Sequence, residues 1–298
     1  MTHSTPAGAT GPGSPGTPGS PGSPDAAGTG APAGRTVLIS GSGRGIGRLT
    51  AQTLLDRGWT VGVYDISDDV DWVDTLPAAT RRRAHRGHLD VTDPESWTAA
   101  LAEFTAATGG RLDALVNNAG ILYGGPFITE GSHERDAALV DVNVKGVLHG
   151  ARAAYPYLRA TPDARLVNLA SASAIYGTPD MAVYSATKFA VRGITEALNL
   201  EWEEDGILVT DVWPLYVRTG MLDGVRTTGT DRLGVRLTPE TVGRAVADVV
   251  EAPRRVPAAV HHPVGLQAKL LYAASHFSPA WLGRYVNAKL TTSRRVRI

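Results

Sequence analysis

Short apolar runs rich in valine and isoleucine alternate along the chain with longer segments of helical periodicity. The runs predict buried β-strands over 36–40, 60–64, 88–91, 112–116, 165–169 and 207–212. The intervening segments are long enough for crossover helices, so the strands are expected to be parallel and covered on both faces. We therefore predict an α/β fold, a doubly wound parallel sheet of about seven strands that is Rossmann-like, with ligands at the carboxyl ends of the strands.

One helix end and one helix start can be placed from local signals. Ile46, Leu49, Leu54 and Leu55 share one side of a helix that Gly58 ends. Thr92 and Glu95 form an expected capping box with Pro94 in the first turn, directly after the strand expected at 88–91. Every candidate site described below follows one of the expected strands.

The first 34 residues differ in composition from the rest of the chain. They are rich in glycine, proline and serine, with almost no large apolar side chain before Val37. Such a segment buries too little surface to offset its ordering entropy, so residues 1–34 are expected to be a disordered, passive tail. They have neither the apolar core of a signal peptide nor the arginines of a transit peptide. Residues 35–298 are expected to form a single domain.

Charge and composition exclude several classes of function. The formal net charge is zero and basic residues are scattered apart from 81–83 and the C-terminus, so nucleic-acid binding is not expected. The chain has no cysteine and no apolar run of the ~20 residues that span a bilayer. We expect a cytoplasmic protein, and no metal site, since His261 and His262 have no further ligands nearby in the sequence.

A glycine-rich turn joins the first expected strand to the first expected helix. It runs from Ser40 to Gly47 and contains Gly41, Gly43, Arg44, Gly45 and Ile46. Glycine lets the backbone turn tightly and approach a ligand, and the start of a helix offers free N–H groups to a pyrophosphate. The turn is a candidate dinucleotide-binding loop because of its position between a strand and a helix.

Asp65 lies at the end of the second expected strand. A carboxylate there can accept hydrogen bonds from the hydroxyls of an adenosine ribose and repels a 2′-phosphate, which favours NAD over NADP. Arg44 argues for the opposite preference, because a guanidinium could bind the 2′-phosphate. We give Asp65 the greater weight and leave NADP as the alternative.

Tyr184 and Lys188 stand four residues apart, with Ser171 thirteen residues before the tyrosine. One helical turn would put the first two side chains on one face. A phenol has a pKa near ~10, and an adjacent ammonium group favours the phenolate, so Lys188 is expected to lower the pKa of Tyr184. Ser171 could then hold a substrate oxygen while Tyr184 moves the proton.

These motifs, in this order, resemble the short-chain dehydrogenase/reductase family of the single-domain type, from Val37 to about residue 221. Ser40–Gly47 resembles the family's glycine turn, and Asn117-Asn118-Ala119-Gly120 its Asn-Asn-Ala-Gly. The resemblance implies that Asp90 and Val91 flank the adenine ring and that Asn117, Ala119 and Gly120 lie beneath the cofactor. It implies a catalytic tetrad and further cofactor contacts after the sixth strand: Asn143, Ser171, Tyr184 and Lys188, then Pro214, Val217 and Thr219.

The resemblance also implies that Lys188 holds the nicotinamide ribose and that Asn143 anchors a water that links Lys188 to solvent.

Three positions compete with or depart from the family pattern. Ser173 competes with Ser171, but the family spacing selects Ser171; Ala170 replaces a second serine that we take as structural; and Leu215 replaces a glycine beside the nicotinamide. Leu215 is expected to alter the loop and the substrate fit more than cofactor binding.

The resemblance implies reversible hydride transfer between a nicotinamide cofactor, NAD or NADP, and a secondary alcohol or ketone. An NADP(H)-dependent carbonyl reductase is the first alternative, and a dinucleotide-binding regulator without turnover is the second. A sugar epimerase or dehydratase of the extended relatives is disfavoured, because too few residues follow Thr219 to form their larger substrate domain.

The last third of the chain carries the expectations about substrate. The segment near 216–237 is expected to be a substrate lid or a surface loop, because residues 221–237 contain three glycines and little periodicity. An apolar helical extension near 264–290 could pack on the core, line a substrate rim, contact a subunit or lie on a membrane surface. We expect an apolar carbonyl substrate, steroid-like or lipid-like, and a homodimer or homotetramer formed by the helices that carry Asn143 and Tyr184.

Overall fold

The computed structural model describes residues 34–67, 70–220, 227–254 and 258–292 of the 298-residue chain. Residues 1–33, most of the segment expected to be a tail, lie outside the described residues. Residues 221–226 of the expected lid also lie outside them.

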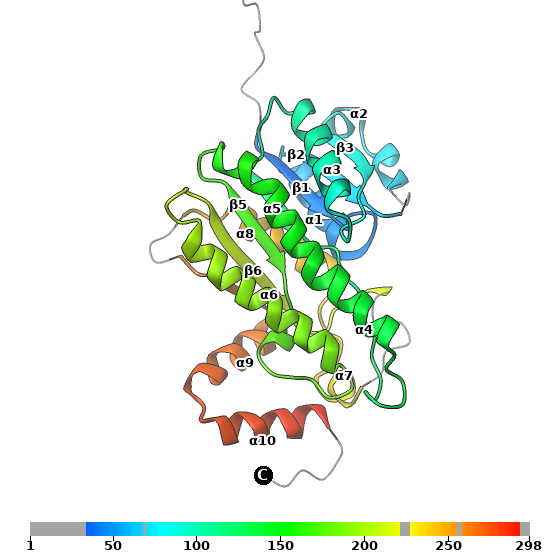
Figure 1. Ribbon diagram of the computed structural model, residues 1–298, viewed down its shortest axis with the longest axis vertical. Coiled ribbons are helices and arrows are strands. Elements are labelled where there is room, and N and C mark those ends of the chain that lie inside the picture. The colour runs from blue at the N-terminus through cyan, green and yellow to red at the C-terminus, as the bar shows by residue number, and fades with distance from the viewer. Residues whose placement is uncertain (1–33, 68–69, 221–226, 255–257, 293–298) are drawn as a thin grey trace, which may run out of the picture. The chain divides into compact units, whose positions relative to one another are not determined.

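One parallel sheet of seven strands organises the described residues, in the order β3-β2-β1-β4-β5-β6-β7 (Figure 1). The strands are β1 Thr36–Ser40, β2 Thr60–Asp65, β3 Ala84–His88, β4 Ala114–Asn117, β5 Arg165–Leu169, β6 Leu208–Pro214 and β7 His261–Val264. The strand order reverses between β1 and β4, and the crevice outside the carboxyl ends of these two strands is where such sheets bind ligands. The predicted doubly wound, Rossmann-like sheet is confirmed.

Helices connect successive strands and cover both faces of the sheet. They are α1 Gly45–Asp56, α2 Ala78–Arg81, α3 Pro94–Ala107, α4 His133–Val140, α5 Gly146–Arg159, α6 Ala182–Glu201, α7 Thr228–Leu233, α8 Pro239–Glu251, α9 Leu266–Phe277 and α10 Ala280–Thr291. Short 3₁₀ turns lie at Asp71–Thr75 and Ala172–Ala174, and a π-helical turn at Asp141–Lys145 joins α4 to α5. None of the helices in the described ranges is long and apolar enough to cross a bilayer.

The alternation of side chains along β1 creates two cores. Val37 and Ile39 pack under α1 and α8, whereas Leu38 faces the opposite side with Trp97 of α3 and Leu158 of α5. Such strands must be apolar on both faces, which explains why the central strands are continuous apolar runs. Figure 1 shows α5 and α6 lying across the strands on this second face.

Both edge strands differ from the sequence-based expectation. The third strand is Ala84–His88, not 88–91. The seventh strand, β7 at His261–Val264, is not an apolar run, and its position was not predicted. An edge strand has one neighbour and exposed positions, so it needs no apolar run and tolerates a proline such as Pro263. Leu89 and Val91 are buried beyond the end of β3, in the core beneath α3.

The expected capping box at Thr92 is also wrong. Asp93 is the residue that caps α3, and its carboxylate accepts a hydrogen bond from the Glu95 backbone N–H at 2.9 Å. The Thr92 hydroxyl instead donates to Asp90 at 2.7 Å. Pro94 does occupy the first turn, so a start for α3 was correctly signalled but placed one residue early.

Candidate active site

The glycine turn after β1 is packed too tightly for side chains at two positions. Gly41 has a φ of +64°, and a Cβ there would lie 2.7 Å from the Ala119 Cα. A Cβ on Gly47 would come closer than 3.0 Å to the Gly41 carbonyl oxygen and to the Asn118 amide nitrogen. Glycine at both positions therefore lets the start of α1 lie directly against the ends of β1 and β4.

Asn118 and Ser40 join the ends of the two central strands. The Asn118 amide donates to the carbonyl oxygens of Ser40 and Gly41 at 2.9 and 2.8 Å. The Ser40 hydroxyl accepts from the backbone N–H groups of Asn118 and Ala119 at 3.1 and 3.2 Å. This network fixes the turn in the shape that leaves the N-terminus of α1, which no side chain caps, at the crevice.

Asp65 has a structural task at the end of β2. Its carboxylate accepts from the Gly43 backbone N–H at 2.8 Å and from the backbone and hydroxyl of Ser67 at 3.1 and 3.2 Å. These bonds hold the glycine turn beside β2. A carboxylate has about four acceptor positions, so Asp65 keeps capacity for a further donor.

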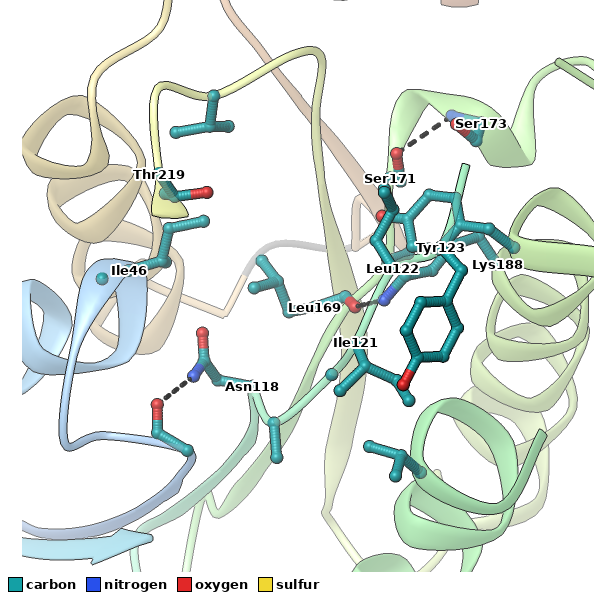
Figure 2. Close-up of a pocket in the computed structure, with 18 of the residues that line it drawn as sticks. Ile46, Asn118, Ile121, Leu122, Tyr123, Leu169, Ser171, Ser173, Lys188 and Thr219 are labelled. Carbon is teal, nitrogen blue, oxygen red and sulfur yellow. Dashed lines mark hydrogen bonds between the residues drawn. The ribbon is translucent and has the colours of Figure 1, made fainter. Parts of the chain in front are cut away.

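The three residues expected to carry the chemistry come together at the ends of β5 and α6. Ser171 follows β5, and its hydroxyl accepts from the Ser173 backbone N–H at 3.1 Å. The Tyr184 phenol lies near enough to the Ser171 hydroxyl for that group to affect its pKa, and the Lys188 ammonium group lies 5.6 Å from the centre of the Tyr184 ring. Figure 2 shows Lys188 reaching the Leu169 carbonyl, to which it donates at 2.8 Å.

Burial controls the protonation of this pair. It raises the pKa of Tyr184 to about 12, opposed by the Ser171 hydroxyl and assisted by the neighbouring Tyr216. Burial also lowers the pKa of Lys188 to about 8. The expectation that Lys188 brings the Tyr184 pKa below its ordinary value is wrong here, because loss of hydration outweighs the favourable contacts. Tyr184 is a protonated phenol at neutral pH.

Asn143 lies behind the cavity, in the π-helical turn between α4 and α5. Its amide accepts from the Ile121 backbone N–H at 2.8 Å and donates to the Ile121 carbonyl at 2.9 Å and to the Thr187 hydroxyl at 3.2 Å. Single π-turns are rare and often occur at functional sites. The turn here directs Asn143 at the segment that carries Gly120 and Ile121; its expected water-anchoring role stays a prediction.

A cavity of about 930 Å³ connects the glycine turn to Ser171, Tyr184 and Lys188. Most of the predicted site residues line it: Gly41, Arg44, Gly45, Ile46, Asp65, Asp90, Val91, Ala119, Gly120, Ser171, Tyr184, Lys188, Pro214, Val217 and Thr219. In Figure 2, Ile46 and Thr219 lie across the cavity from Ser171 and Lys188.

Four predicted residues do not line the cavity. Gly43 and Gly47 shape the turn, and Asn143 holds Ile121. Asn117 is buried in the sheet, where its amide donates to Asn168 at 3.0 Å and to the Val147 carbonyl at 3.4 Å. Their place in the family motifs reflects the scaffold of the site rather than its surface.

The residues present fit a nicotinamide dinucleotide. The uncapped start of α1 can receive the pyrophosphate. Gly45 leaves space beside it, because even a Cβ added to this residue would have no atom within 4 Å. The cavity is near the upper end of the ~300–1,000 Å³ typical of ligand sites, as an extended ligand requires. At the other end, Lys188 offers donors to ribose hydroxyls.

The loop after β6 contributes a residue that the sequence analysis passed over. Tyr216 lines the cavity and belongs to the same apolar cluster as Met181 and Tyr184. Burial raises the pKa of this tyrosine and the Thr227 side chain opposes the rise; the tyrosine hydroxyl would lie less than 3.0 Å from a Cβ on Gly229. Leu215, expected to alter this loop, also lines the cavity.

Further lining residues come from loops with no recognisable periodicity and from the first turn of α4. They are Leu122 and Tyr123 after β4, Tyr176, Thr178 and Met181 before α6, and Glu130 and Arg135 near the start of α4. A tyrosine or methionine in a loop carries no positional signal of its own. Only the segment between Ser171 and Tyr184, already bounded by two candidate residues, could have directed attention to Tyr176 and Met181.

Comparison with known proteins independently supports the resemblance to the short-chain dehydrogenase family. The family model for short chain dehydrogenases matches residues 35–229. A 3-alpha-(or 20-beta)-hydroxysteroid dehydrogenase of Mycobacterium tuberculosis is 37% identical over 192 residues, which cover 64% of this chain and 72% of that protein. A cyclopentanol dehydrogenase of a Comamonas strain is 36% identical over 228 residues, covering 72% of this chain and 89% of that protein.

A solved structure shows the same architecture. The 3-ketoacyl-(acyl-carrier-protein) reductase of Brucella melitensis, complexed with NADH, superposes with a TM-score of 0.69 at 26% identity, over 78% of this chain and 96% of that one. The family match covers β1 to β6, the glycine turn and the Ser171, Tyr184 and Lys188 group. It ends at residue 229, so β7 and α8 to α10 lie outside it. The chain therefore belongs to the short-chain dehydrogenase family, as its motifs had indicated.

Proposed function

We propose that this protein is an NAD-dependent oxidoreductase that interconverts an apolar secondary alcohol and its ketone. The observation that carries the proposal is the meeting of Ser171, Tyr184 and Lys188 in one cavity with the uncapped start of α1. This arrangement puts a proton donor at one end of a dinucleotide-sized space and an anion-binding helix end at the other.

Hydride exchange is the chemistry that a bound nicotinamide would supply. The chain itself manages the proton. In ketone reduction, the protonated Tyr184 phenol donates to the carbonyl oxygen, and in alcohol oxidation the same oxygen takes the proton back. Ser171, which lies beside the phenol, would hold the substrate oxygen as its charge changes.

Lys188 would act on both partners of the reaction. Its ammonium group lies close enough to the Tyr184 ring to favour the phenolate that proton donation leaves behind. It would also donate to the nicotinamide ribose, exchanging its bond to the Leu169 carbonyl. Asn143 would act indirectly as a positioning residue, because its bond to Ile121 fixes the backbone next to Gly120. The Lys188 ammonium group lies beside Gly120, which has no side chain to obstruct it.

The preference for NAD rests on the charges around Asp65. Asp65 lines the cavity, and Ile66, Ser67, Asp68 and Asp69 follow it in sequence, so no basic residue comes next. A 2′-phosphate would have to approach this carboxylate against Coulomb repulsion. Arg44 also lines the cavity and favours NADP as the second candidate, and a Burkholderia cenocepacia gluconate 5-dehydrogenase of 26% identity was solved with NADP.

An apolar substrate fits the side chains around Tyr184. Leu122, Met181, Leu215 and the rings of Tyr176 and Tyr216 line that end of the cavity. The named substrates of two relatives, a hydroxysteroid and cyclopentanol, are both largely hydrocarbon. Near the two ends of the segment expected to be a lid, the Arg218 backbone N–H donates to the Leu237 carbonyl at 2.9 Å.

We also propose a homo-oligomer that uses the helices carrying Asn143 and Tyr184. Val140 at the end of α4 and Phe189 on α6 are exposed apolar residues on these helices. Analytical ultracentrifugation of the protein with Phe189→Ser tests this separately from activity.

The experiment that tests the function is a substrate screen. Purified protein is mixed with NAD⁺ or NADP⁺ and a panel of secondary alcohols that includes hydroxysteroids, cyclopentanol and polar sugar alcohols, and the absorbance of the reduced cofactor is followed. We expect turnover with NAD⁺ and the apolar alcohols. Turnover confined to the sugar alcohols would contradict the proposed substrate class, and none with either cofactor would contradict the activity.

A further inference from the structure

Helices α9 and α10 expose large apolar side chains in helical register. Leu266, Leu270 and Phe277 recur at spacings of four and seven on α9, and Phe277 is 90% exposed. Trp281, 63% exposed, and Tyr285 follow four residues apart on α10. Figure 1 shows the two helices joined end to end by a short turn beyond the sheet. Phe277 and Trp281 flank that turn, so the most exposed rings lie together at the corner.

The same segment carries only one sign of charge. No Asp or Glu follows Glu251, although the whole chain has as many acidic as basic residues. From Leu266 onward the basic residues are Lys269, Arg284, Lys289, Arg294, Arg295 and Arg297. Helices that carry basic residues together with Trp, Phe and Leu are typical of segments that lie in the headgroup region of a membrane.

Tyr272 and several polar and small side chains attach these helices to the domain. The Tyr272 ring packs edge-on against Trp213, with the ring centres 5.3 Å apart. The Gln267 amide donates to the Leu233 carbonyl at 3.2 Å, and the Asn287 amide to the Gly177 carbonyl at 2.9 Å. The Arg232 guanidinium donates to the carbonyl oxygens of Lys289 and Thr292. Ala268 and Thr291 are the two buried residues of the pair. The large apolar side chains named above are therefore not needed to hold the helices in place.

We propose that α9 and α10 bind the surface of an anionic lipid bilayer, with Phe277 and Trp281 inserted at the headgroup level. Charge decides between this surface and a second copy of the chain. A two-fold contact through this face would set Lys269, Arg284 and Lys289 of both copies against each other, whereas an anionic bilayer is complementary to them.

The position of the helices links this surface to the cavity. The Asn287 side chain donates to the Gly177 carbonyl, and Gly177 directly follows the cavity residue Tyr176. Both helices lie beyond the end of the family match. The bilayer binding does not depend on the proposed function. It would place the apolar end of the cavity close to a phase in which apolar substrates accumulate.

Flotation with vesicles tests the proposal on the full chain. One set of vesicles contains equal parts of phosphatidylglycerol and phosphatidylcholine, and the other contains phosphatidylcholine alone. We expect the protein to float with the anionic set at low salt and to be released at high salt. Phe277→Ser with Trp281→Ser should reduce the bound fraction by about tenfold or more, since two rings lose their apolar contact.

Charge neutralisation and a matched control sharpen the test. Lys269→Gln, Arg284→Gln and Lys289→Gln should each weaken binding by about fivefold. Ile128→Ser with Leu200→Ser removes exposed apolar residues elsewhere, 85% and 72% exposed, and should float like the wild type. Circular dichroism confirms that each variant is folded.

Failure of the folded wild type to float with anionic vesicles would overturn the proposal. So would equal flotation of the Phe277→Ser, Trp281→Ser variant and the wild type. A dimer in solution that this variant dissociates, without any vesicle binding, would assign the face to a second copy instead. Each of these results is independent of alcohol turnover, so the proposal fails separately from the proposed function.

Discussion

Replacement of Gly47 by alanine should destabilise the domain and weaken dinucleotide binding together. The new Cβ would come closer than 3.0 Å to two groups, the Gly41 carbonyl oxygen and the Asn118 amide nitrogen. The first is backbone, and the second is held by bonds of 2.9 and 2.8 Å to Ser40 and Gly41. Neither can move without separating α1 from the ends of β1 and β4.

The size of the effect follows from three contributions. Overpacking of a tight contact costs about 1–3 kcal/mol. Loss of the two Asn118 hydrogen bonds adds about 1 kcal/mol each. Alanine is favoured over glycine in a helix by about 1 kcal/mol, which offsets part of the cost. We expect Gly47→Ala to lower the free energy of unfolding by about 2–4 kcal/mol.

Gly193 provides the matched control, because it is also a helical glycine. It lies exposed on α6, and a Cβ there would meet nothing within 4 Å. Gly193→Ala should leave binding unchanged and raise stability by up to about 1 kcal/mol.

Urea denaturation measures both free energies of unfolding, and fluorescence titration with NADH measures binding. A Gly47→Ala variant that unfolds at the same urea concentration as the wild type would refute the close packing of the turn.

Three further predictions address charge and the substrate loop. Asp65→Ser should improve the affinity for NADP⁺ relative to NAD⁺ by about tenfold, since one like-charge contact of ~1–2 kcal/mol is removed; competitive titration with the two cofactors measures this. Burial opposes the charge on His261, but hydrogen bonds to Asp211 and Glu196 raise its pKa above 6.5. The stabilisation from this group is therefore complete below pH 6.5 and lost as pH rises through the folded-state pKa, so thermal melts of wild type and His261→Gln should diverge most at acidic pH. Tyr216→Phe, which removes a hydroxyl from a residue that lines the cavity, should change KM for the alcohol by more than KM for NAD⁺ in steady-state kinetics.

The central strands could be predicted because burial on both faces demands unbroken apolar runs. The edge strands β3 and β7 could not, since Ala84–His88 and His261–Val264 meet one neighbour and carry polar residues. The capping signal before α3 was ambiguous for a similar local reason. Thr92 and Asp93 are both good caps, and only the bond from Thr92 to Asp90 shows which one is free to accept from the helix.

The candidate site divides in the same way. Motif order placed Ser171, Tyr184 and Lys188 together because their spacing follows from a strand end and one helical turn. The direction of the Tyr184 pKa shift could not be predicted, because it depends on how completely the surrounding loops exclude water. Tyr216 was missed for the same reason: its role depends on Thr227 and Gly229, which only the folded chain brings to it.

The most direct test of the central claim compares the wild type with Tyr184→Phe, which deletes the phenol oxygen and keeps the ring. Dinucleotide affinity, followed by NADH fluorescence, should be unchanged. The kcat for reduction of an active ketone should fall by about 10²–10⁴-fold, the usual contribution of a positioned proton donor. Turnover that survives in Tyr184→Phe at the wild-type rate would contradict the assignment of Tyr184 as the group that moves the proton.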